Sequence, residues 1–219
     1  MQRALEYFAV NVILLLIFQP SYDIMQCMVY CKTYLLKNIA TIQSGYALRS
    51  KAPETPNGTM SLLQTKDLGS AGIDWQNLLT MNPLNKRNPY FLKKGDVIFL
   101  GKGTHIKAHA ITATPENVAA GPQFFVLTLI HGILPEYLAW YINSVHGQKY
   151  FWTFAGSSIL VNVTREVLEN CPVYLPSLRD QASISSLDLA TRTEKQLALE
   201  LYMKRQTMIE KIILQRMGN

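Results

Sequence analysis

The stretch Gly101-Lys102-Gly103-Thr104 has residue types that could bind a phosphate, because glycines let a backbone wrap around an anion beside a lysine. A Walker loop requires a glycine five positions before the glycine of its Gly-Lys pair, and a serine or threonine directly after the lysine. Here Asp96 occupies the earlier position and Gly103 follows Lys102. The spacing excludes this type of nucleotide site and leaves Lys102 as a cation in a predicted turn.

Histidines and carboxylates could bind a metal ion, which is the second possible chemistry. His105 and His109 are four residues apart, but no carboxylate accompanies them as in a zinc protease helix, and residues 110–112 indicate a strand. Asp67 and Asp96 could be half of a nuclease metal site, although turn or cap roles suit them better. We expect no metal and no cofactor, and a magnesium-dependent nuclease is one rival hypothesis.

Basic and amide side chains in loops around the expected strands give the third possibility. Arg and Lys can bond guanine, Gln can bond adenine, and any of them can reach phosphate. Side chains of these types can recognise nucleic acid but do not cleave it. The alternative is a basic surface that is only solvated. The candidate DNA-binding residues are Gln43, Ser44, Tyr46, Arg49, Lys51, Gln64, Lys66, Lys102, His105 and Lys107, and a further basic loop carries Lys86 and Arg87.

The composition allows one sizeable core and a partner of negative charge. The chain has 219 residues, of which 48% are hydrophobic and 16% charged, so it is no disordered polypeptide. Its 21 Lys and Arg against 15 Asp and Glu give a net charge of +6. Cys27, Cys31 and Cys171 are too few and too irregular for a disulfide framework, which indicates a reduced, cytoplasmic protein.

Short apolar runs separated by turn residues predict a mixed α+β domain. Lys93-Lys94-Gly95-Asp96 and residues 101–103 are predicted turns, and Gln43-Ser44-Gly45-Tyr46 is a turn in which Gly45 permits a left-handed backbone. Pro135 opens a helix that runs through Ser144, and Thr164 caps a short helix that ends near Asn170. The predicted strands are residues 60–64, 97–100, 124–130 and 173–175.

The C-terminal residues 177–215 predict one long helix, which Ser177 and Asp180 can cap. Such a rod is roughly 55 to 60 Å long, so a small domain at one end cannot cover it. Its apolar stripe predicts pairing with another helix, although a helix folded back on its own domain is the alternative. The predicted dimer and partner-docking residues are Ile184, Leu187, Ala198, Leu201, Met208 and Ile212.

The N-terminal residues 1–33 differ from the rest and receive no predicted role. Their apolar run over residues 8–18 is too short for a bilayer span, which needs about 20 residues. A packed or mobile helix, an upstream start codon and a signal peptide are the three interpretations, in that order.

Four segments resemble, in order, the target recognition domain of type I restriction-modification specificity (S) subunits. They are Ile42-Gln43-Ser44-Gly45-Tyr46-Ala47-Leu48-Arg49, Leu63-Gln64-Thr65-Lys66-Asp67-Leu68, Leu92-Lys93-Lys94-Gly95-Asp96-Val97-Ile98-Phe99 and Leu134-Pro135-Glu136-Tyr137-Leu138. Gly156-Ser157-Ser158 and Leu175-Pro176-Ser177-Leu178-Arg179-Asp180-Gln181 resemble the end of that domain and the start of its helical spacer. The similarity extends from about Leu35 to the C-terminus.

The resemblance implies a curled, mixed β-sheet recognition domain with short helices, followed by a coiled-coil-type helix. It also implies a non-catalytic reader of double-stranded DNA that docks a methyltransferase (M) subunit and, in some systems, a restriction (R) subunit. Family members usually carry two recognition domains and two such helices, whereas this chain has one of each. We therefore expect a half-subunit that forms a homodimer and has no membrane partner.

The expected domain boundaries are an extension at 1–33, a DNA recognition domain at 34–176 and a spacer helix at 177–219. In addition to the nuclease hypothesis, there are two alternatives to the half-subunit hypothesis. One is a helical protein-interaction module without DNA affinity, and the other is a truncated, inactive specificity-gene remnant. The fused restriction-methylation enzymes contain a domain of the same shape, so the type of partner stays open.

Overall fold

The computed structural model describes residues 32–48, 54–69, 72–84, 89–103, 105–130, 132–155 and 161–217. The predictions for residues 1–31 and for the turn at Gly156-Ser157-Ser158 lie outside these ranges. The same holds for Arg49, Lys51, Lys86 and Arg87.

A four-stranded antiparallel sheet forms the centre of the domain. Its order is β2 (Ala40–Ser44), β11 (Phe124–Leu129), β7 (Asp96–Leu100) and β9 (Lys107–Ala110). Side chains alternate along the strands, so that Val97 and Phe99 of β7 enter one buried cluster and Ile98 and Leu100 enter another. The sheet is therefore covered on both faces, which explains why residues 97–100 of β7 are an uninterrupted apolar run.

A three-stranded sheet covers one face of the central sheet. Its order is β10 (Val118–Ala120), β3 (Met60–Leu63) and β6 (Leu79–Met81), with β10 parallel to β3 and β6 antiparallel to it. Gly45 lies where the two sheets meet, because its N–H donates to the carbonyl of Phe124 and a Cβ on it would lie 2.0 Å from the carbonyl oxygen of Gly121. The predicted left-handed turn at Gly45 is wrong, since close backbone approach is what requires glycine there.

Helices cover the other face of the central sheet. They are α2 (Pro135–Asn143), α3 (Val145–Ala155) and the short α4 (Arg165–Glu169). The Tyr137 and Tyr141 hydroxyls of α2 donate to the carbonyls of Tyr174 and Pro172, and so fix α2 to β13 (Pro172–Leu175). Strand β13 pairs with β1 (Lys32–Leu35), which leads through the 3₁₀ turn η1 (Leu36–Asn38) into β2.

Several short elements complete the domain. The 3₁₀ turn η2 (Thr65–Asp67) follows β3 and leads into a small hairpin of β4 (Leu68–Gly69) and β5 (Gly72–Ile73). Strand β8 (Lys102–Gly103) pairs with β12 (Val161–Asn162). The prediction of a simple turn at residues 101–103 is therefore wrong, because a strand nearly sixty positions away in the sequence pairs with them.

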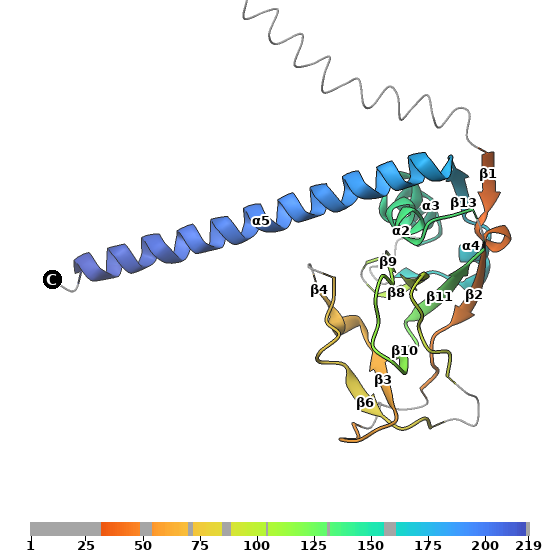
Figure 1. Ribbon diagram of the computed structural model, residues 1–219, viewed down its shortest axis with the longest axis horizontal. Coiled ribbons are helices and arrows are strands. Elements are labelled where there is room, and N and C mark those ends of the chain that lie inside the picture. Colours follow the sequence, from red (N-terminus) through yellow and green to blue (C-terminus); the bar gives the residue numbers. More distant parts are fainter. Residues whose placement is uncertain are drawn as a thin grey trace, which may run out of the picture.

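The helix α5 (Leu178–Met217) leaves the domain beside α2 and α3, and most of its length runs free of the strands (Figure 1). It begins as predicted, since the Ser177 hydroxyl accepts a bond from the N–H of Asp180. Residues 189–217 are exposed throughout. The alternative of a helix folded back on its own domain is therefore wrong for all but the first turns of α5. The apolar residues form no single stripe, because Leu197 and Leu199, separated by about 200°, occupy opposite sides and are both exposed.

The predicted α+β class with one long C-terminal helix is confirmed. The strands predicted at 60–64, 97–100, 124–130 and 173–175 correspond to β3, β7, β11 and β13. The strand predicted at 110–112 begins and ends earlier in the structure, as β9. Among the described helices, none is long and apolar enough to cross a membrane.

Candidate nucleic-acid interface

The predicted basic residues of the β8–β9 segment are exposed. Lys102 lies on β8, Lys107 begins β9, and His105 lies between them. Gly103 has φ +140°, a conformation that side chains rarely adopt, and a Cβ on Gly101 would lie 2.9 Å from the Phe99 ring. The two glycines thus let the chain leave the buried strand β7 within three residues and present cations on the surface.

A groove of about 550 Å³ opens where α5 passes β9. Its walls come from β9, α3, the β4–β5 hairpin and α5. His105 and Lys107 lie on the domain side, Arg192 lies on the α5 side, and Trp152 of α3 contributes a half-exposed indole. The sequence analysis predicted His105 and Lys107 as DNA contacts, and the structure brings both beside Arg192, which was not predicted.

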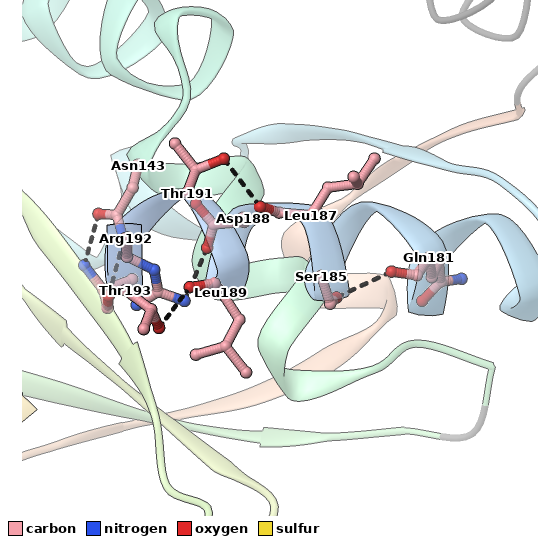
Figure 2. Close-up of polar contacts among 10 residues, drawn as sticks. Asn143, Gln181, Ser185, Leu187, Asp188, Leu189, Thr191, Arg192 and Thr193 are labelled. Atoms are coloured by element: carbon pink, nitrogen blue, oxygen red, sulfur yellow. Dashed lines mark hydrogen bonds and ion pairs between the residues drawn. The ribbon is translucent and has the colours of Figure 1, made fainter. Parts of the chain in front are cut away.

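Asn143, which lines this groove, closes the edge of β9. Its Oδ1 accepts from the N–H of Ala108 at 2.9 Å, and its Nδ2 donates to the carbonyl of the same residue at 2.8 Å. The side chain therefore acts as a further strand partner for an edge that would otherwise expose unpaired backbone groups. Figure 2 shows Asn143 at the end of α2, facing β9 next to the stretch of α5 that carries Arg192.

Arg192 is oriented by an ion pair within α5. One nitrogen of its guanidinium group lies 2.7 Å from Oδ2 of Asp188, one helical turn earlier (Figure 2). Asp188 is only 24% exposed, whereas Arg192 is 63% exposed. Because a guanidinium has five N–H donors, the pair holds Arg192 in place and leaves other donors free to bind an anion.

His109 lies between these cations in the wall of the groove. Within the part of the chain that the structure describes, its Nε2 is buried without a hydrogen-bond partner. Burial, followed by the positive charges of Lys107 and Arg192, lowers the pKa of His109 below its ordinary value of 6.5. The imidazole is therefore neutral at pH 7, and the fixed charges facing the groove are those of Lys107 and Arg192.

The predicted residues of β2 lie elsewhere in the domain. Gln43 is half-buried and Ser44 is exposed at the end of β2, which forms the opposite edge of the central sheet from β9. Three strand spacings, or about 14 Å, separate these edges. Tyr46 lies in a buried cluster with its hydroxyl accepting from the N–H of Leu84 at 2.7 Å, so this ring supports the fold and is not available to contact DNA.

The predicted residues of η2 are divided between a structural and an exposed position. Gln64 precedes η2, and its N–H donates to the carboxylate of Asp67 at 2.7 Å. Lys66 is exposed within η2, three residues before Gly69, which lines the groove. Lys66 therefore remains a candidate DNA contact on the side of the domain where the β4–β5 hairpin lies.

The two carboxylates of the nuclease hypothesis have structural partners. Asp96 is 2% exposed and accepts hydrogen bonds from the hydroxyls of Tyr90 and Thr128 and from the N–H of Lys93. Asp67 is 5% exposed and accepts from Gln64. No group of three potential metal-ligating side chains occurs among the described residues. Both aspartates thus perform the turn and cap roles that the sequence favoured.

The predicted helix residues differ in their surroundings. Ile184 packs against the helical core of the domain, whereas Leu187, Ala198, Leu201, Met208 and Ile212 are exposed. Gln181, missed by the sequence analysis, fixes the start of α5 and is 0% exposed. Its Oε1 accepts from the N–H of Leu134, and its Nε2 donates to the carbonyls of Gly132 and Pro176.

This geometry defines a class of protein. It is an α+β domain that carries exposed cations and is followed by a long exposed helix. The family model of the type I restriction modification DNA specificity domain matches residues 28–201. The match covers most of the sequence, so the chain belongs to this family. The family provides DNA specificity and not catalysis, so the chain is a non-catalytic specificity domain.

Solved structures have the same fold. The S subunit of a type I restriction-modification system from M. genitalium is 14% identical, with a TM-score of 0.51, over 80% of this chain and 42% of its own. The HsdS subunit from Thermoanaerobacter tengcongensis is 16% identical, with a TM-score of 0.50, over 90% of this chain and 50% of its own. This chain thus spans about half the length of these proteins. No curated protein gave a significant match.

Proposed function

We propose that this chain reads one half-site of a DNA target as the specificity component of a restriction-modification complex. The observation that carries the proposal is the match to the DNA specificity family over residues 28–201. The exposed cations Lys66, Lys102 and Lys107 support it, since DNA binding requires positive groups that reach phosphate. A DNA reader of this kind acts in the cytoplasm, where it meets the chromosome.

Binding combines two terms of different kind. Each phosphate that a Lys or Arg neutralises releases counterions and steepens the dependence of affinity on salt by roughly 0.9. Side chains that contact base edges then discriminate sequences, at about 1 to 3 kcal/mol for each good bidentate contact. Gln43 and Ser44, together with the predicted contacts Arg49 and Lys51 that follow them in the sequence, are candidates for this second term.

The exposed part of α5 provides the contact with a second copy. Residues 189–217 include the apolar side chains Leu201, Met208 and Ile212, which are 52%, 59% and 44% exposed. Such side chains gain free energy when a partner helix removes them from water. Two copies paired through α5 would contain two recognition domains and about the length of the solved S subunits, of which this chain covers half.

The same helix is the proposed docking site for a methyltransferase subunit and, where one exists, a restriction subunit. Apolar side chains such as Leu199 and Met203 lie on the side of α5 opposite to Leu201, and they are 57% and 58% exposed. A helix with apolar residues on both sides can contact two partners at once. The alternative of a protein-interaction module without DNA affinity uses this same observation, so DNA binding decides between the two.

The test is light scattering combined with size-exclusion chromatography on the full chain. It is applied to the chain alone, to the chain with the methyltransferase subunit of its own system, and to both with duplex DNA. We expect two copies in the free protein, one complex with the methyltransferase, and retention of DNA in that complex. A monomer that retains neither partner would overturn the proposal and favour an inactive remnant.

A further inference from the structure

The groove between α5 and β9 has charges of one sign on its walls. Lys107 contributes a positive charge from β9 and Arg192 contributes one from α5, whereas no Asp or Glu lines it within the described part of the chain. A neighbouring hollow on the other side of Arg192 is different, because Glu136 and Asp188 line it. The two hollows share His109 and Arg192, and the carboxylates line only the second.

The amide groups in this groove are already engaged within the protein, and among them Nε2 of Gln196 donates to Oε1 of Glu200. Asn143 exchanges two hydrogen bonds with Ala108, and Nε2 of Gln148 donates to the carbonyls of Ile106 and Ile142. Amides that recognise adenine must offer both a donor and an acceptor to one base edge. The charged groups that remain free to bind a ligand are Lys107 and Arg192, which can reach phosphate as well as guanine.

The dimensions of the groove also favour a backbone. Its volume of about 550 Å³ accommodates a short stretch of one sugar–phosphate strand, and a whole duplex would not fit. The half-exposed Trp152 ring forms an apolar wall against which a sugar can pack. Gly69 and Gly72 also line the groove and carry no side chains, which lets a strand approach the protein closely there.

We infer that this groove anchors the sugar–phosphate backbone of one DNA strand through Lys107 and Arg192, independently of base sequence. The inference rests on the proposed function and adds that the spacer helix itself contacts DNA. The ion pair with Asp188 orients the Arg192 guanidinium for this contact. Since α5 and the domain each supply one cation, a bound strand contacts the reader and the spacer together.

The test compares two double variants of the full chain that lose equal charge. The first is Lys107→Gln with Arg192→Gln, in the groove. The control is Arg179→Gln with Lys195→Gln, two exposed cations of α5 outside it. Fluorescence anisotropy gives the affinity for the target duplex and for a scrambled duplex at several salt concentrations, with the methyltransferase subunit present.

We expect the groove variant to reduce the slope of log affinity against log salt by about 1.8, which is two contacts at roughly 0.9 each. Its affinity falls by the same factor on target and scrambled DNA, and the control keeps the wild-type slope. The charge-conserving Arg192→Lys variant keeps most of the slope, and circular dichroism melting shows that each variant is folded.

Three results would overturn the inference. An unchanged slope in the groove variant would reject the groove and leave the proposed function intact. A loss confined to the target duplex would show that the groove reads bases. If the wild-type complex binds no DNA at all, the proposed function fails and this inference fails with it.

Discussion

Gln181 shows how one polar residue can fix the direction of a whole element. It is fully buried, and its amide joins α5 to the loop before α2 and to Pro176 through three hydrogen bonds. Replacing it with alanine leaves the N–H of Leu134 and the carbonyl of Gly132 without a partner. An unsatisfied buried group costs about 1 to 3 kcal/mol.

We therefore expect Gln181→Ala to lower the free energy of unfolding by about 1 to 3 kcal/mol in urea titrations. Ser183→Ala is the control, because that hydroxyl is exposed and bonds only within α5. A loss in Gln181→Ala no larger than in the control would contradict this structural role.

His109 predicts a pH dependence of stability. Its pKa in the folded protein is lowered by burial and by Lys107 and Arg192, so the unfolded chain binds more protons as the pH falls below about 6.5. Stability contributed by the neutral imidazole is present above this pH and is lost below it. We expect the free energy of unfolding to fall between pH 7.5 and pH 5.5.

The variant His109→Gln should show a smaller fall over the same pH interval, as measured by urea titration at each pH. His105→Gln is the matched control, because His105 is exposed. Equal pH dependence in the wild type and in His109→Gln would show that the buried imidazole does not titrate as its surroundings require.

Residue roles that depend on near neighbours could be predicted from the sequence. The Thr164 hydroxyl caps α4 by accepting from Val167, three residues on, and Pro135 begins α2. Gln181 and Asn143 could not be predicted, since their partners lie 47 and 35 positions away. Their types are ordinary on an exposed helix, and only the tertiary fold shows that they are buried.

The long helix could likewise be predicted as an element, because it has continuous helical residues and a local cap at Ser177. Which side of the helix packs against the domain could not be predicted. That side is set by Gln181 and Ile184, whose contacts are distant in the sequence. The strand β8 was missed for the same reason, because its partner β12 is remote.

Pairing of two copies through α5 is an expectation that belongs to this element. The double variant Leu201→Asp with Ile212→Asp places two carboxylates on the proposed seam, where burial of charge is unfavourable. We expect light scattering to show a monomer whose circular dichroism still reports the folded domain, because both side chains are exposed in the single chain.

Thr207→Asp is the control, since Thr207 lies about 120° around the helix from Leu201. That variant should remain a dimer. If light scattering gives the double variant and the control the same molecular mass as the wild-type dimer, the two copies pair through another face of α5.

At the scale of the whole molecule, the recognition domain is attached to one end of a helix of 40 residues, or about 60 Å (Figure 1). We retain as a proposal the division into a recognition domain at 34–176 and a spacer at 177–219. Antiparallel pairing of two such helices would place two readers at opposite ends of a rod. The separation of the half-sites would then follow from the length of α5.

The most direct test of this account is selection of binding sites from a pool of randomised duplexes, with the full chain and its methyltransferase subunit. Two identical readers related by a two-fold axis predict one enriched motif with two inverted half-sites and a gap of constant length. A pool without any enriched motif would contradict the assignment as a DNA reader. A single uninterrupted half-site would contradict the paired arrangement.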